Sequence, residues 1–423
     1  MIRVTSEVER LRRVVVQPPG PALERMLPEH IVPESSQYLL FDDLVDVPQA
    51  QREHRQLCDV LASVAEVLHF QDLLADVLEL ESARGALIED VTALHSLSDS
   101  QERMLRSMDA KSLAATMVVG TAGGDVDEEA LFHPAPNLIF TRDLAAVVGE
   151  VVVVGNASKR ARQRETLMSW AVMNSHPLFA DTQITEVSRR VHREGGSAPL
   201  TVEGGDVLVI SSSLVCIGAS ERTSWAMIVA LADELLDGGF TRVLVAEMPK
   251  QRSSMHLDTV FTMTNWDTGV VYPPLLELGS REEAKAIRLR RVGSATAVEE
   301  LGCDLFDALA QEGHPLTAIH CGGGHPIHAR REQWTDGANY VCLGPGVVVG
   351  YARNRHTALE MQAAGFEILS PAEYLSVVSK DFGGDAEALL ASGRRIAIHI
   401  AGYELSRGRG GPRCLTMPLW RDG

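Results

Sequence analysis

The sequence predicts a fold of the α/β class in which one structural unit occurs five times. Each copy contains an aspartate, two short runs of β-branched residues with a turn between them, a helical run and one further strand. The chain has 423 residues, of which 45% are apolar, so it can bury a sizeable core. No single copy is large enough to bury a core alone. We therefore expect the five units to stack around a common axis.

The third unit shows the pattern most clearly. In chain order it contains strands at 206–210 and 214–218, a helix at 221–236 and a strand at 242–246. Gly238 and Gly239 stop the helix, as glycines commonly do at helix C-termini.

The other four units fit the pattern less tightly. The first has strands at 11–16 and 41–43, a helix over 49–67 and a strand at Leu68. The second has strands at 137–141 and 151–155, a helix over 160–173 and a weak strand near Ile184. The fourth has strands at 258–262 and 269–272, a helix over 296–312 and a strand at 316–320. The fifth has Asp336, strands at 340–343 and 347–351, a helix over 356–364 and a strand at 366–369.

An acidic segment interrupts the repeats between the first and second units. Residues 72–129 hold 13 Asp and Glu residues against 4 Lys and Arg residues. Apolar residues recur in it at helical spacing: Leu73, Leu74, Val77, Leu78, Met104, Leu105, Met108 and Leu113. We therefore expect a helical insert domain at 74–133, with the repeated units formed by 1–73 and 134–423.

The composition of the chain argues against nucleic-acid and membrane partners and indicates the compartment. The formal charge of −18 argues against a nucleic-acid partner, because phosphate binding needs a basic face and no cluster of Lys and Arg is long. The 6 cysteines show no paired spacing, which indicates a reducing compartment. No signal peptide or membrane-spanning apolar segment is visible, so we expect a cytoplasmic protein with no membrane partner.

One cysteine, one histidine and several carboxylates carry the candidate chemistry. Cys414 follows a loop at 406–413 that is rich in Gly and Arg, which suits a delivered nucleophile. His256 offers proton transfer, and the carboxylates are Asp143, Glu203 and Asp258. Residues two apart in a strand share a face, so His256 and Asp258 are expected to point into one pocket. Such a set suits attack on a strongly basic, cationic carbon.

Structural roles compete with these assignments. An aspartate recurs at the position of Asp206 in each unit. A structural role for Asp206, as a cap of the hairpins, therefore explains it as well as a role in the chemistry does. Glu203 lies beside Gly204 and Gly205, which would let a ligand approach the backbone. The histidine and cysteine run at 320–328 suggests zinc, but no second ligand pair accompanies it, so we expect no metal.

An ordered set of motifs along the chain resembles arginine deiminase, a family of the guanidine-modifying or amidinotransferase superfamily. The motifs are Ser6 and Glu7, Leu11 and Arg12, Pro19 and Gly20, LFDD at 40–43, FTRD at 140–143, RQRET at 162–166, EGGD at 203–206, SER at 220–222, MHLDTVF at 255–261, REQW at 331–334 and the loop into Cys414. The resemblance implies a five-bladed, pseudo-symmetric α/β propeller of ββαβ repeats with a helical bundle inserted after the first blade.

The resemblance also implies hydrolysis of L-arginine to L-citrulline and ammonia, without metal or organic cofactor. Cys414 would be the nucleophile, His256 the general acid and base, Asp143 and Asp258 the guanidinium clamp, and Glu203 a supporting carboxylate. The positions that match substrate-binding residues of the family are Asn137, Arg162 and Arg222 for the α-carboxylate end, Leu40 and Phe140 for apolar walls, and Arg409 for a loop arginine near the thiol.

The chemistry agrees with these roles. A guanidinium is a permanently charged planar fork, which carboxylates on two sides can fix by charge-assisted hydrogen bonds. Nearby carboxylates disfavour a free thiolate, whereas a bound guanidinium favours it, so we expect Cys414 to ionise fully only with substrate.

The sequence leaves other readings open. The segment 370–403 is longer than the family leads us to expect, so a modified arginine is an alternative substrate. An amidinotransferase is a second alternative, and a non-catalytic arginine-binding protein is a third. We also expect a homo-oligomer, either a dimer or a tetramer.

Overall fold

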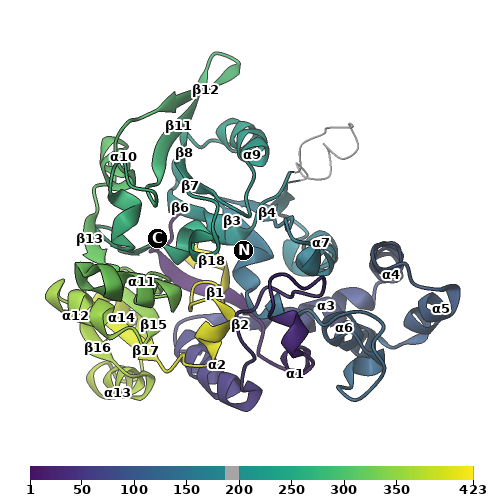
Figure 1. The fold of residues 1–423 in the computed structure, drawn as a ribbon. Helices are drawn as coiled ribbons and strands as arrows, with labels where there is room; N and C mark the ends of the chain where they lie inside the picture. Colours follow the sequence, from purple (N-terminus) through teal and green to yellow (C-terminus); the bar gives the residue numbers. More distant parts are fainter. Residues whose placement is uncertain (186–199, 423) are drawn as a thin grey trace.

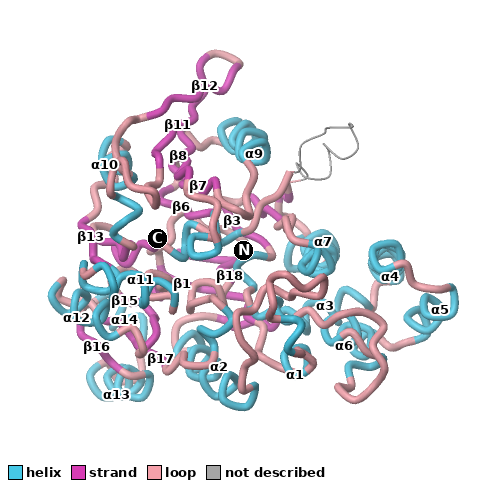
Figure 2. The backbone as a smooth tube through the Cα atoms, viewed as in Figure 1, coloured by secondary structure: helices cyan, strands magenta, loops and turns pink. Residues whose placement is uncertain are grey.

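The computed structural model describes residues 1–185 and 200–422. Within these residues, five β-sheets lie together and helices pack around them, so the fold is of the mixed α/β class (Figure 1). The helices lie mostly at the periphery and the strands toward the middle (Figure 2). No helix of the described part is long and apolar enough to cross a membrane.

The first sheet joins the two ends of the chain. Its order is β18 (Met417–Asp422), β1 (Arg10–Val16) and β2 (Glu66–His69), with β1 antiparallel to β18 and parallel to β2. Helix α2 (Val47–Ala62) connects β1 to β2 and begins at Asp46, whose carboxylate accepts from the backbone of Gln49. The predicted strand at 41–43 is wrong, because the C-terminal strand β18 takes the place beside β1.

The segment between the first and second sheets is helical. Its helices are α3 (Phe70–Leu78), α4 (Glu81–His95), α5 (Asp99–Ser107) and α6 (Ala110–Val119). A capping box at Ser98 and Gln101 starts α5, and Gly120 ends α6 in the left-handed conformation. These helices extend to one side of the sheets (Figure 1).

The second sheet has the order β3 (Ala145–Val148), β4 (Val151–Val154) and β5 (Gln183–Ile184), and α7 (Gln163–Ser175) lies between β4 and β5 in the chain. The predicted strand at 137–141 is wrong. Two 3-10 turns, η3 (Pro136–Ile139) and η4 (Thr141–Asp143), occupy that stretch instead. Pro136 favours the turn because it fixes φ and lacks a backbone donor.

The third sheet has five strands in the order β12 (Ala295–Glu300), β11 (Lys285–Val292), β8 (Arg242–Glu247), β7 (Leu214–Ala219) and β6 (Val207–Ser211). The strands predicted for the third unit are confirmed. Its helix α9 (Trp225–Asp237) begins later than expected, because Ser224 caps it by accepting from the backbone of Met227. The β11–β12 hairpin projects from the rest of the fold (Figure 1).

The fourth sheet has the order β13 (Thr317–His320), β10 (Thr268–Val271) and β9 (Phe261–Asn265). The predicted helix over 296–312 is wrong in its first half. Residues 295–300 form β12, and the helix α10 (Leu305–Gln311) begins only after the Asp304 cap. The β-branched residues at 296 and 298 favour a strand, and β11 supplies its partner.

The fifth sheet contains a strand that the repeat pattern did not include. Its order is β14 (Val341–Gly344), β15 (Val347–Tyr351), β17 (Ile396–Ile400) and β16 (Glu367–Leu369), with helices α11 (Pro326–Trp334) and α12 (Arg355–Ala363) nearby. The segment 370–403 supplies β17 and the helices α13 (Pro371–Asp381) and α14 (Ala386–Ala391). β17 pairs in parallel with both neighbours, so the extra residues widen the sheet.

One further short α-helix is α1 (Pro21–Glu24), and the remaining 3-10 turns are η1 (Pro28–His30), η2 (Ala122–Gly124), η5 (Arg160–Arg162), η6 (Pro177–Phe179), η7 (Gly204–Asp206), η8 (Arg252–Ser254), η9 (Leu257–Thr259), η10 (Pro273–Leu276), η11 (Cys321–Gly324) and η12 (Leu405–Gly408).

The closing strand β18 is anchored in the core. Met417 and Leu419 are fully buried in the same hydrophobic cluster as the apolar faces of α3, α6, α7 and α9. Arg421 donates to the carbonyl oxygen of Cys342 at 2.9 Å and so ties β18 to β14. The C-terminal strand therefore joins several parts of the molecule.

We expect Leu419→Ala to lower the free energy of unfolding by about 2–5 kcal/mol, because it removes a buried side chain and leaves a cavity. The matched control is Leu278→Ala, at a leucine that is 56% exposed, which should change stability by no more than about 0.5 kcal/mol. Urea denaturation measures both. Equal losses for the two variants would contradict the anchoring role of β18.

Candidate active site

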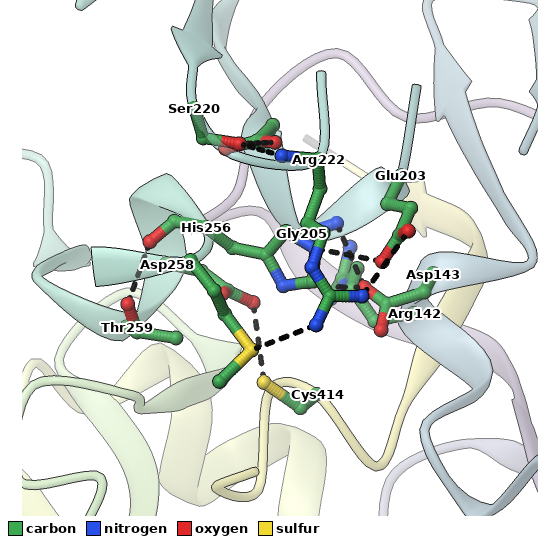
Figure 3. Close-up of polar contacts among 12 residues, drawn as sticks. Arg142, Asp143, Glu203, Gly205, Ser220, Arg222, His256, Asp258, Thr259 and Cys414 are labelled. Carbon is green, nitrogen blue, oxygen red and sulfur yellow. Dashed lines mark hydrogen bonds and ion pairs between the residues drawn. The ribbon is translucent and has the colours of Figure 1, made fainter. Parts of the chain in front are cut away.

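The candidate active site lies where the loops that precede the first strands of the sheets meet. Asp143 precedes β3, Glu203 precedes β6, and His256 and Asp258 precede β9. Cys414 precedes β18 in the same way. All five residues are buried, and their side chains gather in one region (Figure 3). Residues far apart in the sequence are thus brought together.

His256 and Asp258 do not lie in a strand, as the sequence led us to expect. His256 has an extended backbone, and the 3-10 turn η9 begins at the next residue. The turn separates the two side chains, so His256 faces Glu203 whereas Asp258 faces Cys414. Both still reach the same site, from two sides.

A buried histidine and two carboxylates form one side of the site. The Nε2 atom of His256 lies 2.9 Å from Glu203 Oε2, and its Nδ1 atom lies 3.7 Å from Asp143 Oδ1. Burial disfavours the charged imidazolium, but the two carboxylates outweigh this effect and raise the pKa of His256 to about 9. His256 is therefore protonated near neutral pH and able to donate a proton.

Two buried arginines neutralise these carboxylates. Arg162 Nη1 lies 2.6 Å from Asp143 Oδ2 and 3.1 Å from Glu203 Oε2, and its Nε lies 2.8 Å from Glu165 Oε2. Arg222 Nη1 lies 3.5 Å from Glu203 Oε1. Burial opposes ionisation of Glu203, but the positive charges of Arg222 and Arg162 have the larger effect and hold the pKa of Glu203 well below the usual range. The site thus holds a guanidinium of the protein itself between Asp143 and Glu203.

The thiol of Cys414 lies on the opposite side. Its Sγ atom accepts from Asn339 Nδ2 at 3.1 Å and lies 3.5 Å from Asp258 Oδ2. The side-chain oxygen of Asn339 accepts from the backbone of Arg413 and of Cys414, which fixes the position of the cysteine loop. Burial and the carboxylates of Asp258 and Asp143 raise the pKa of the thiol well above its usual value. Cys414 is therefore a protonated thiol until a cation approaches.

Asp258 is held by a second buried arginine. Arg413 Nη1 lies 2.8 Å from Asp258 Oδ2, and the same guanidinium binds both carboxylate oxygens of Glu7 at 3.1 Å. The other oxygen of Asp258, Oδ1, is buried and has no hydrogen-bond partner among the described residues. A buried acceptor left unpaired is costly, so Oδ1 is available for a donor that enters the site.

Asp206 does not cap a hairpin, contrary to the structural role suggested by its repeated position. Its Oδ2 accepts from the hydroxyls of Ser220 and Thr223 at 2.6 Å, and its Oδ1 accepts from the backbone of Leu257 at 2.9 Å. Burial raises the pKa of Asp206 to about 7 against the opposing effect of these contacts. Asp206 therefore joins the loop that carries Arg222 to the loop that carries His256.

The two glycines after Glu203 serve the protein's own groups. A Cβ atom at Gly204 would lie 2.1 Å from the carbonyl oxygen of Arg142, and one at Gly205 would lie 2.8 Å from the ring of His256. The expectation that these glycines admit a ligand is wrong, because a protein carbonyl and the histidine ring already occupy the space.

The remaining predicted binding residues line a small cavity of about 20 Å³. Its walls include all the expected binding residues, namely Leu40, Asn137, Phe140, Arg162, Arg222 and Arg409, together with Asp143, His256 and Cys414. No residue of the segment 370–403 contributes to this lining, so the long segment does not cover the site.

Arg409 closes one end of this cavity. Its guanidinium lies 3.8 Å from the ring centre of Trp334 and donates to the backbone oxygen of the same residue. Its own backbone is left-handed, with φ of 65°.

Three of the buried site residues carry atoms that could bind a metal ion. Asp143, Glu203 and His256 offer ligand atoms within 4.8 Å of one another. However, the carboxylate oxygens that face inward already accept from Arg162, and His256 Nε2 faces Glu203. The arrangement therefore suits a guanidinium better than a metal ion. Among the described residues, the run at 320–328 forms no group with ligand-like spacing.

Sequence reasoning missed two residues that hold the site together, Asn339 and Arg413. Asn339 stands directly before β14, at the position that carries chemistry in the other units, and a search of that position would have found it. Arg413 is the last residue of the Gly- and Arg-rich loop at 406–413, but nothing in the sequence pairs it with Glu7 and Asp258. Such pairings exist only in the folded chain.

Known proteins of one enzyme family are similar to this chain over nearly its whole length. The sequence profile of the arginine deiminase family matches residues 37–421. The arginine deiminase of Limosilactobacillus reuteri is 32% identical over 443 aligned positions, covering 100% of this chain and 98% of that protein. The arginine deiminase of Rhodococcus erythropolis is 34% identical over 443 positions, covering 99% and 97%.

Solved structures show a similar fold at low sequence identity. The N-terminal domain of ArgZ, a cyanobacterial arginine dihydrolase, matches with a TM-score of 0.50 at 12% identity, covering 97% of this chain and 98% of that one. AgrE matches with a TM-score of 0.50 at 13% identity, and this chain spans 40% of its length. Full-length matches to the family profile and to relatives above 30% identity show that the chain belongs to the arginine deiminase family.

Proposed function

We propose that the protein hydrolyses L-arginine to L-citrulline and ammonia through a covalent intermediate on Cys414. One observation carries the proposal: the buried carboxylates across the site from the thiol, Asp143 and Glu203, already bind a guanidinium, that of Arg162. A substrate guanidinium offers the same planar set of donors. The activity of the named relatives supports the same reaction.

The substrate guanidinium would lie between Asp143 and Asp258. Asp258 Oδ1 is the unpaired acceptor on the thiol side, and Asp143 is the acceptor on the histidine side. The cavity is much smaller than an arginine molecule, so Arg162 has to leave Asp143 when substrate enters. Arg162 and Arg222 would then bind the α-carboxylate, together with Asn137, while Leu40 and Phe140 form the apolar walls.

The chemical steps follow from the protonation states. The bound guanidinium cation lowers the cost of ionising Cys414, which releases its proton to solvent, and the thiolate then attacks the guanidinium carbon. His256, which is protonated, donates its proton to the departing nitrogen, and ammonia leaves a thiouronium on Cys414. His256 then takes a proton from water as the oxygen attacks the same carbon. The carbon–sulfur bond breaks and the sulfur takes up the proton of the new hydroxyl, which releases citrulline and restores the thiol. The proton that Cys414 released at the start leaves with ammonia as ammonium. Glu203 keeps His256 oriented through both halves.

We also infer that the five sheets are the blades of a pseudo-symmetric α/β propeller. Each sheet contains an antiparallel first pair of strands and a parallel third strand, and the site residues precede the first strand in every case. On this view residues 1–73 and 134–423 form the catalytic propeller, and 74–133 form the insert. Apolar side chains of the insert belong to the same hydrophobic cluster as the second and third sheets, so the insert packs firmly against them.

We propose a cytoplasmic location, supported by the 6 cysteines, all of which are free. The homo-oligomer stays a prediction, which a mass measurement in solution decides.

We expect Cys414→Ser to abolish citrulline formation while leaving arginine binding, because a hydroxyl ionises far less readily than a thiol of similar size. A colorimetric citrulline assay and calorimetry measure the two properties. Cys303→Ser, at a partly exposed cysteine away from the site, is the control and should retain full activity. Mass spectrometry of quenched wild-type enzyme should place the covalent adduct on Cys414. An adduct on another cysteine would contradict the assignment of Cys414 as the nucleophile.

Substrate choice tests the two arginines. Agmatine lacks the carboxylate, so it would leave buried Arg162 and Arg222 facing an empty site, and its kcat/KM should be lower than that of arginine by roughly 10²-fold or more. Arg222→Ala should mainly raise KM for arginine. Arg160→Ala, at an exposed arginine, serves as the control. Similar kcat/KM values for agmatine and arginine would count against a carboxylate-binding pair.

The clamp is tested by comparing two aspartates. Asp143→Ala should lower kcat/KM by roughly 10² to 10³, since loss of one partner from a buried charge pair costs about 3–5 kcal/mol. Asp206→Ala leaves two hydroxyls and the backbone of Leu257 unpaired, so it should lower the melting temperature more and also reduce kcat through His256. Steady-state kinetics with thermal melts measure both. Near-normal turnover by Asp143→Ala would show that Asp143 does not bind the substrate guanidinium and would contradict the proposed mechanism.

A further inference from the structure

A second polar pocket lies outside the catalytic cavity, between α11 and the start of α12. It has a volume of about 220 Å³, and its lining includes His328 and Arg331 from α11 and Arg353, Arg355 and His356 from the start of α12. The two helices lie beside each other at the edge of the fold (Figure 1). None of these five residues lines the catalytic cavity. The proposed reaction therefore makes no use of this pocket.

The residues that line this pocket include more arginines than carboxylates. Within residues 1–185 and 200–422, the side chains of Arg331 and Arg355 form no hydrogen bond or ion pair, although Asp and Glu far outnumber Lys and Arg in the chain as a whole. One carboxylate, Glu332, also lines the pocket. Its two oxygens are already bound by the backbone of His356 and Thr357 at 2.8 Å and by the Thr357 hydroxyl at 2.7 Å. Arg331 and Arg355 therefore have no carboxylate partner, because Glu332, the one carboxylate in the pocket lining, is bound by the start of α12.

Two imidazoles line the same pocket. The rings of His328 and His356 stack with their centres 3.7 Å apart and their planes 13° apart. Burial, His356 and His325 lower the pKa of His328, and Glu332 acts in the opposite direction. An anion placed between the rings and the arginines would favour protonation of His328, because it supplies the negative charge that the imidazolium needs.

Arg353 connects the pocket to the loop that leads to the catalytic thiol. Its Nη1 atom donates to the backbone oxygen of Tyr403 at 3.2 Å and to the hydroxyl of Ser406. Ser406 accepts in turn from the backbone of Arg409, and Arg409 lines the catalytic cavity. The guanidinium of Arg353 thus lies between the second pocket and the catalytic loop.

We propose that this pocket binds a small phosphate-bearing anion through Arg331, Arg353 and Arg355, with the two histidines as additional donors. Arginine forks match phosphate oxygens in pairs, and the pocket volume accommodates one or two phosphate groups. A polyphosphate satisfies three converging cations better than a monovalent ion does, because it presents several oxygens and more than one negative charge.

Calorimetric titration of the purified protein with inorganic pyrophosphate, and separately with inorganic phosphate, tests the site at constant ionic strength set with chloride. We expect saturable binding of pyrophosphate with a dissociation constant of about 1 mM or tighter, and weaker binding of phosphate. Arg331→Gln and Arg355→Gln should each weaken pyrophosphate binding by about tenfold or more, since each removes a charge-assisted contact. Both side chains are exposed, so the variants should fold as the wild type does.

Arg330→Gln is the matched control. Arg330 is an exposed neighbour on the same helix, but it faces a different cleft and does not line this pocket. It should leave the dissociation constant within twofold. Absence of saturable heat up to 10-fold above the expected constant would overturn the proposal, as would equal weakening by Arg330→Gln and Arg355→Gln. Binding is measured without turnover, so the result does not depend on the proposed catalytic function.

Discussion

The site depends on the balance between buried carboxylates and buried arginines. Arg162 lies among Asp143, Glu203 and Glu165, and Arg413 lies between Asp258 and Glu7. Removal of one partner from such a buried pair leaves an uncompensated charge at a cost of several kcal/mol. The same balance sets the two protonation states that the chemistry needs, because it keeps His256 charged and the thiol of Cys414 neutral before a cation arrives.

The position of the Cys414 thiol, the proposed nucleophile, depends on a contact between the two ends of the chain. Cys414 and Arg413 stand immediately before β18, which pairs with β1. Glu7, which precedes β1, binds the guanidinium of Arg413 that orients Asp258. The position of the thiol therefore depends on contacts between residues far apart in sequence, since Glu7 and Arg413 are separated by 406 residues.

Two polar connections align the loops around the substrate position. Asp206 links the loop of Arg222 to the backbone beside His256, and Asn339 links the fifth sheet to the backbone of Arg413 and Cys414. Each is a small buried side chain whose hydrogen bonds reach more than one segment, since Asn339 also donates to the carbonyl oxygen of Asp258. Each therefore fixes a relative position that neither segment determines alone. Such fixed placement matters because a displacement of about 1 Å can cost 10²-fold in rate.

The sequence by itself determined the α/β class, most of the repeated strands and the identity of the residues that meet in the site. Local signals suffice for these, since β-branched runs, helix caps such as Asp304 and a cysteine after a glycine loop act over a few positions. Tertiary structure decided which strands pair: β18 beside β1 in place of a strand at 41–43, β17 between β15 and β16, and β12 beside β11 where a helix was predicted. It also decided that Arg413 pairs with Glu7 and Asp258 and that Asp206 joins two loops. Strand pairing and buried ion pairs gain their energy from groups that meet only in the folded chain, such as Glu7 and Arg413 at a separation of 406 residues. A pattern read along the chain contains no record of which groups will meet.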